Sequence, residues 1–148
     1  MKQENKNLLL KDLCARLPYG VKCENFNHVY GKNIFKVTDI RNNGYICGTI
    51  NNEHCWAVFD PLELKPYLFP LSSMTEEQYN TLHESGILNN CSHSYEYVNP
   101  HIYGISFIFK QFKTYSLELI EWLNKNHFDY RGLIKKGLAI DATELNVY

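Results

Sequence analysis

Two pairs of cysteine and histidine residues have side-chain types and spacing that could perform chemistry. Cys91 lies two residues before His93, and His54 directly precedes Cys55. A thiol beside an imidazole can act as a nucleophile with its base, so Cys91 and His93 could form the centre of a small enzyme. Together, the four side chains also offer the nitrogen and sulfur donors that zinc binds.

The spacing of these residues argues against a metal centre. Zinc ligands usually come in Cys-x2–4-Cys or His-x3–5-His units, and neither pair has that form. Adjacent side chains on a strand point to opposite faces, so His54 and Cys55 are poorly placed to bind one ion. We therefore expect no metal ion and no other cofactor, and we keep Cys91, His93 and His127 as catalytic candidates.

A denser group of polar side chains lies near the C-terminus, at His127, Asp129, Tyr130 and Arg131. A carboxylate beside a His and an Arg can orient an acid–base pair or bind a phosphate group. The spacing also has a structural explanation, because Asp129 can cap a following helical turn and Arg131 can pair with a carboxylate. We favour the structural explanation, and we keep the cluster as a first choice for a ligand or partner site.

The composition predicts a single soluble globular domain spanning residues 1–148. Hydrophobic residues make up 45% of the chain, charged residues 21%, and the net charge is −1. The five cysteines are an odd number, and we find no secretory signal and no apolar run of the ~20 residues that cross a membrane. We therefore expect free thiols, a cytoplasmic location and no membrane contact. The missing basic excess disfavours nucleic-acid binding.

The elements that must position these side chains begin with a helix. Asn5 or Asn7 can cap this helix, and Pro18 ends it. A meander of strands follows, in which Asn43-Gly44 favours a tight type I′ hairpin. The apolar stripe of the helix contains Leu9, Leu10, Leu13, Cys14 and Leu17, and the strands are expected at residues 19–24, 34–41, 45–50 and 54–59.

The second half of the sequence predicts two further helices. Three prolines predict an ordered connector over residues 61–73. Either Ser73 with Glu76 or Thr75 with Gln78 can form a capping box for a helix that runs to about Ser85, before Gly86. Ser116 can cap a helix over residues 117–125. Strands are expected at residues 94–98 and 101–109. The fold class is therefore α+β, with an antiparallel β-sheet (meander) packed against about three helices.

Three segments of the sequence resemble one protein family. They are residues 12–21 (DLCARLPYGV), 65–77 (KPYLFPLSSMTEE) and 124–134 (NKNHFDYRGLI). Together they are similar to small uncharacterised proteins of phages, prophages and mobile elements of gut anaerobic bacteria. The resemblance implies an accessory protein of a mobile element, located in the cytoplasm of its host. It implies no functional residues.

The eleven tyrosines favour a binding module slightly, and a tyrosine-rich β-sheet core would explain the same count. Tyr and Arg are enriched at protein–protein binding hot spots, which indicates a non-enzymatic module that binds another protein, with a homodimer as one form. Two alternatives remain: a nucleic-acid-binding module that uses the basic turn with Lys135 and Lys136, or a small Cys/His enzyme. The residues expected to bind are Tyr95, Tyr97, Asp129, Tyr130 and Arg131.

Overall fold

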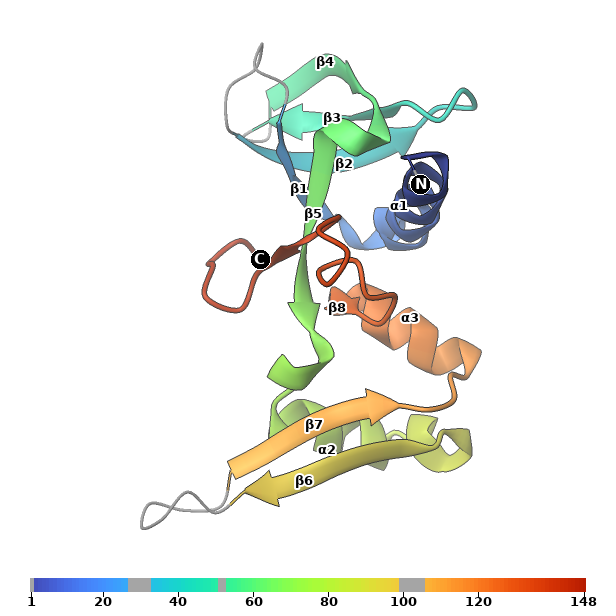
Figure 1. The fold of residues 1–148 in the computed structure, drawn as a ribbon, viewed down its shortest axis with the longest axis vertical. Helices are drawn as coiled ribbons and strands as arrows, with labels where there is room; N and C mark the ends of the chain where they lie inside the picture. The colour runs from blue at the N-terminus through green and yellow to red at the C-terminus, as the bar shows by residue number, and fades with distance from the viewer. Residues whose placement is uncertain (1, 27–32, 51–52, 99–105) are drawn as a thin grey trace. The chain divides into compact units, whose positions relative to one another are not determined.

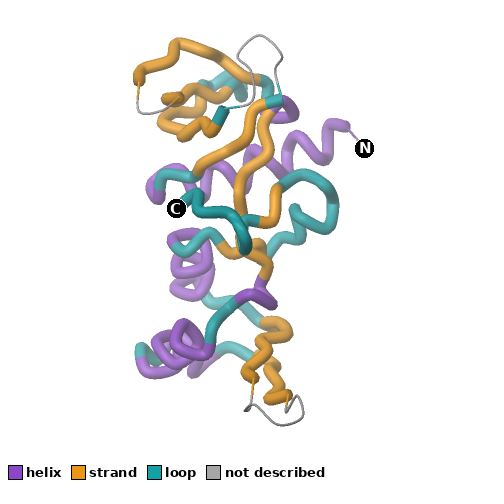
Figure 2. The backbone as a smooth tube through the Cα atoms, turned by 90° about the vertical axis from the view of Figure 1, so that its left-hand side faces the viewer, coloured by secondary structure: helices purple, strands orange, loops and turns teal. Residues whose placement is uncertain are grey.

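The computed structural model describes residues 2–26, 33–50, 53–98 and 106–148 (Figure 1). The chain forms two compact units, and each is described by itself. Unit 1 consists of Met1–Leu68 and Arg131–Tyr148, and unit 2 consists of Phe69–Tyr130. Both units contain helices and strands (Figure 2).

Unit 1 is built on an antiparallel sheet with the strand order β4–β3–β2–β1–β5. A short strand near the C-terminus, β9, pairs in parallel with β5. The strands expected in the meander are confirmed as β1 to β4, with shifts of up to three residues at their ends. The bounds are β1 Lys22–Asn25, β2 Ile34–Ile40, β3 Ile46–Ile50, β4 Glu53–Phe59, β5 Leu64–Pro70 and β9 Ile140–Asp141.

Helix α1 (Lys2–Arg16) starts earlier than the capping residues predicted. The prediction that Asn5 or Asn7 caps it is wrong, since both lie inside the helix. The Gln3 side-chain amide donates to Asn7 Oδ1 at 2.9 Å, one turn further on. This i,i+4 contact occupies the Asn7 oxygen that a cap would use. The helix passes into a 3₁₀ turn (Leu17–Tyr19) that contains Pro18, as the sequence predicts.

The loop between β2 and β3 differs from the predicted type I′ hairpin. Gly44 N donates to Arg41 O and Arg41 N donates to Tyr45 O, both at 2.8 Å, which leaves three residues in the loop. Gly44 has φ 80°, and among described non-glycine residues only His127 has a positive φ. A type I′ turn needs positive φ at both central residues, so glycine alone takes the left-handed conformation here.

Residues 61–73 contain strand β5, which the sequence did not predict. The prolines predict a connector, yet Pro66 lies opposite Cys23 of β1 and Leu68 lies opposite Asp141 of β9. A proline removes only its own N–H from a ladder, and β5 still pairs with β1 over residues 64–66 and with β9 at residues 67 and 68. Pairing with strands distant in the sequence therefore decides the conformation of this segment.

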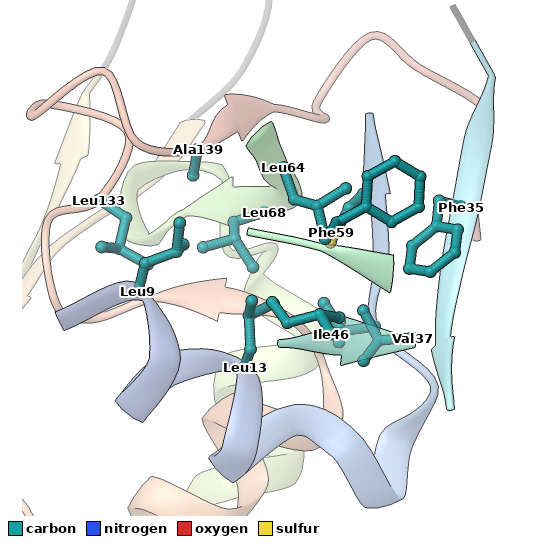
Figure 3. Packing of buried hydrophobic residues seen from close by; sticks show 12 residues of the cluster. Leu9, Leu13, Phe35, Val37, Ile46, Phe59, Leu64, Leu68, Leu133 and Ala139 are labelled. Atoms are coloured by element: carbon teal, nitrogen blue, oxygen red, sulfur yellow. The ribbon is translucent and has the colours of Figure 1, made fainter. Parts of the chain in front are cut away.

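Buried apolar side chains from the helix, the sheet and the C-terminal segment form the core of unit 1 (Figure 3). Leu9 and Leu13 come from one face of α1. The rings of Phe35 and Phe59 meet edge to face, with centroids 4.8 Å apart. Leu133, which is fully buried, belongs to the same cluster, so residues 131–148 complete this core.

An ion pair is buried beside these apolar side chains. Arg16 and Asp12 lie one turn apart on α1, and both side chains have 0% exposure. Arg16 Nε donates to Asp12 Oδ2 at 2.7 Å, and Arg16 Nη2 donates to Asp12 Oδ1 at 3.2 Å. Arg131 Nε lies 3.7 Å from Asp12 Oδ1. One buried carboxylate thus faces two guanidinium groups within unit 1.

Unit 2 contains two helices and a hairpin. Helix α2 (Glu76–Glu84) begins with the second of the two predicted capping boxes, in which Gln78 N donates to Thr75 Oγ1 at 3.2 Å and Thr75 N donates to Gln78 Oε1 at 2.9 Å. The Ser73 hydroxyl donates to Pro70 O instead, at 2.7 Å. Gly86 follows α2 with φ 76°, and Ser116 caps α3, both as predicted. The bounds are α2 Glu76–Glu84, β6 His93–Val98, β7 Ser106–Phe112, α3 Leu117–Lys125 and β8 Phe128–Asp129, and β8 pairs in parallel with Phe69 and Pro70 at the end of β5.

These elements confirm the α+β class, with three α-helices among the described residues and strands that pair mostly antiparallel. The strand predicted over residues 101–109 is found at the later position of β7, and its residues 101–105 lie outside the described part of the chain. No helix in the described ranges has both the length and the apolar character that crossing a membrane requires.

Candidate functional site

Aromatic side chains gather on one face of the β6–β7 hairpin. His93, Tyr95 and Tyr97 alternate along β6, so they share a face. On β7, Phe107 lies opposite Tyr97 and Phe109 lies opposite Tyr95. Helix α2 packs behind the hairpin in Figure 1. We call the partly exposed set Tyr95, Tyr97 and Phe107 the aromatic surface.

Helix α2 covers only part of this face. The ring of Tyr79, which is buried, lies 5.0 Å from Tyr95 and 5.2 Å from Phe107, measured between centroids. Phe109 is fully buried, whereas Tyr95 and Tyr97 are 44% and 51% exposed. The rings of Tyr95 and Tyr97 stand nearly perpendicular, at 85°. The core of unit 2 therefore continues outward into two tyrosines that present their rings to solvent.

The same tyrosines lie on a strand with an open edge. Within the described residues, β7 is the only strand paired with β6. Tyr95, Glu96 and Tyr97 are all exposed in the middle of β6. An edge strand leaves backbone N–H and C=O groups unpaired, and extended segments of other chains can pair with such an edge.

Unit 2 has a net negative charge, and one of its carboxylates lies beside the aromatic surface. Unit 2 contains seven acidic and three basic residues, a net charge of −4. Tyr97 Oη donates to Glu76 Oε1 at 3.0 Å. This hydrogen bond is the main cause that raises the pKa of Tyr97, and desolvation and the Glu76 charge add to it. On the opposite face of the hairpin, Lys110 and Glu96 form an ion pair at 2.5 Å.

Cys91 and His93 lie close in unit 2, but their reactive atoms bind other groups. His93 Nδ1 lies 3.1 Å from the carbonyl oxygen of Cys91, and its Nε2 lies 3.0 Å from Tyr79 Oη. A carbonyl can only accept, so Nδ1 donates to it, and Nε2 is engaged by the Tyr79 hydroxyl. The Cys91 thiol donates to Ile87 O at 3.5 Å. Both ring nitrogens thus serve groups other than the thiol.

The C-terminal cluster is divided between the two units. His127, Asp129 and Tyr130 belong to unit 2, and Arg131 belongs to unit 1, where it contacts Asp12. His127 is buried with φ 58°, and its N–H donates to Asn124 O as the chain leaves α3. Asp129 is buried in β8, and the ring of Tyr130 lies 5.8 Å from that of Tyr115. Each of these residues therefore has a structural contact or a buried position within its own unit.

The remaining candidates are a metal site and a small-molecule pocket, and the described residues support neither. The side chains of His54 and Cys55 lie outside the described residues. Among the residues that the structure describes, no three His, Cys, Asp or Glu side chains come together to hold a metal ion. A cavity of about 240 Å³ is lined by polar groups that include Asn90, Ser116 and Glu118, but by none of the predicted site residues. Its volume is below the roughly 300 Å³ at which small-molecule sites begin.

The thiols provide a first prediction, which concerns Cys91. Cys14 is exposed, whereas Cys91 and Cys23 are buried, and desolvation followed by the charge of Asp12 raises the pKa of the Cys23 thiol. Because the thiolate is the reactive form and needs access to solvent, iodoacetamide should modify Cys14 at least about tenfold faster than Cys91. Peptide mass mapping over time measures both rates. Preferential labelling of Cys91 would instead reveal the activated nucleophile of an enzyme.

Comparison with known proteins adds no relative to this picture. No protein-family model matches the chain, and neither a curated protein nor a solved structure matches it significantly.

Proposed function

We propose that this protein is a non-enzymatic module that binds another protein through the aromatic surface and the open edge of β6. The observation that carries this proposal is the exposure of Tyr95 and Tyr97 on top of a packed aromatic cluster. The resemblance of residues 12–21, 65–77 and 124–134 to mobile-element proteins suggests that the partner is a phage or host protein in the cytoplasm.

Tyrosine at this position favours binding for a physical reason. Each ring supplies a large apolar area and a polar hydroxyl group with few torsions to fix, so it gains contact at low entropy cost. Tyr95 is held between Tyr79 and Tyr97, with ring centroids 5.0 and 5.8 Å away. A side chain that is already ordered loses little further freedom when a partner covers it.

The test uses a photo-crosslinking amino acid, p-benzoylphenylalanine, in place of Tyr95 or Tyr97 in the cell that naturally makes the protein. A crosslinked protein is identified, purified and titrated against the full chain by calorimetry, with a second copy of this chain as one possible result. Tyr97→Ala should then weaken binding at least about 30-fold, which corresponds to a hot spot of about 2 kcal/mol.

Tyr45→Ala is the matched control, because Tyr45 is 41% exposed but lies in unit 1. It should leave the dissociation constant unchanged. Melting temperatures of both variants show whether each is folded. The proposal fails if the purified partner binds the Tyr95→Ala and Tyr97→Ala variants as tightly as it binds the original chain.

A further inference from the structure

We infer that the aromatic surface selects a basic partner segment, one that presents arginine or lysine side chains to Tyr95, Tyr97 and Glu76. This inference rests on the function proposed above and specifies the chemistry of the partner. It follows from three features of unit 2: the orientation of the exposed rings, the carboxylate beside them, and the placement of the lysines.

The exposed rings are suited to cations. The face of an aromatic ring carries negative electrostatic potential, and Arg or Lys groups are attracted to it within about 6 Å. Tyr95 and Tyr97 stand at 85° with centroids 5.8 Å apart, so they offer two differently oriented ring surfaces next to each other. A planar guanidinium group can lie on one of them and still donate hydrogen bonds at its edge.

A carboxylate lies where such a group would donate. Glu76, at the start of α2, accepts a hydrogen bond from Tyr97 at Oε1. An ionised carboxylate has several lone pairs, so Glu76 can accept from a guanidinium as well. Glu77, the next residue on the helix, is also exposed. An incoming basic side chain would therefore find aromatic faces and a carboxylate together.

Among the described residues of unit 2, no lysine forms an ion pair with Glu76, and Lys110 pairs with Glu96 instead. Both residues of this pair alternate to the opposite face of the hairpin from Tyr97 and Phe107. Lys113 follows β7, and Lys125 ends α3. The Glu76 carboxylate beside the exposed rings would therefore attract a basic segment and repel an acidic one.

The experiment uses three fluorescent nonapeptides that differ at every second position, where they carry Arg, Gln or Glu. The remaining positions are the same in all three peptides and are filled by Thr and Val. The alternation suits pairing with the edge of β6. Binding to the full chain is followed by fluorescence anisotropy. The Arg peptide should bind at least about tenfold tighter than the Gln peptide, and the Glu peptide should bind weakest. Raising the salt concentration should weaken the Arg peptide most, because screening reduces its attraction.

Glu76→Gln separates a local effect from net charge. It keeps the hydrogen-bond acceptor for Tyr97 but removes the charge, so affinity for the Arg peptide should fall about fivefold or more while the Gln peptide is unaffected. Glu84→Gln, at the other end of α2, changes the net charge of the unit equally and should have little effect. Equal losses in both variants would overturn the inference.

The outcomes distinguish this inference from the proposed function. If all three peptides bind equally and each loses affinity in Tyr97→Ala, the aromatic surface binds proteins but does not select charge, and only the inference falls. If the Arg peptide binds Tyr97→Ala and the original chain alike, the attraction is not located at this surface, and the inference also falls. Absence of Arg-peptide binding at millimolar concentration overturns it as well.

Discussion

Replacing Asp12 with alanine is expected to lower the free energy of unfolding by about 3–5 kcal/mol, the cost of removing one partner from a buried ion pair. The Asp12 side chain is fully buried and accepts from Arg16 at 2.7 Å. The variant leaves the guanidinium of Arg16 in an apolar interior without this carboxylate, and Arg131 loses the same neighbour. Urea unfolding followed by circular dichroism measures the loss.

Two further variants isolate the cause of this effect. Glu96→Ala removes a carboxylate–ammonium ion pair from the surface, where Lys110 and Glu96 are 46% and 48% exposed, and should cost less than about 1 kcal/mol. The double variant Asp12→Leu/Arg16→Met removes both charges of this buried pair and should be more stable than Asp12→Ala alone. A loss in Asp12→Ala no larger than in Glu96→Ala would show that burial adds nothing to this pair.

Gly48→Ala is the second substitution with a large expected effect, a loss of about 3 kcal/mol or more. Gly48 lies in β3, opposite Val37 of β2. A Cβ atom there would stand 2.0 Å from the Lys36 carbonyl oxygen and 2.6 Å from the ring of Phe35. The oxygen belongs to the backbone, so no rotation of a side chain relieves the overlap, and β2 must move away from β3.

Gly137→Ala provides the control for this prediction. Gly137 has φ 69° and no atom within 4 Å of an added Cβ, so alanine there costs only the strain of a left-handed residue, about 1–2 kcal/mol. Urea midpoints compare the two variants, and hydrogen exchange of peptides from β2 and β3 locates the damage. If Gly48→Ala proved as stable as Gly137→Ala, the close approach of Lys36 to Gly48 would be wrong.

Among the candidate site residues, the sequence indicated Tyr95 and Tyr97 but not their surroundings. Alternation along residues 94–98 placed both tyrosines on one face of a strand. That α2 would cover Phe109 and leave Tyr97 half exposed depends on a helix that begins more than twenty residues earlier in the chain. The sequence also placed Cys91 and His93 together, and the structure shows the imidazole bound to Tyr79 and a carbonyl instead of the thiol.

The sequence by itself determined the ends of helices α2 and α3, which depend on residues close together in the chain. A capping box at the start of α2, the cap at Ser116 and the left-handed Gly86 all follow from groups within a few residues of one another, although the sequence left Ser73 and Thr75 as alternative caps of α2. Such interactions form between residues that the chain keeps close in any conformation, so the local pattern is sufficient to predict them.

Strand pairing and burial depend on residues that are far apart in the sequence, and only the tertiary structure decided them. It made a strand of residues 64–70 despite Pro66, because β1 and β9 pair with successive parts of that strand. It buried Asp12 and Arg16 on the face of α1 that also carries Leu9, and it divided the buried apolar side chains into two clusters that share no residue. Burial and pairing are set by side chains and strands far away in the sequence, and no local pattern records which of them will meet.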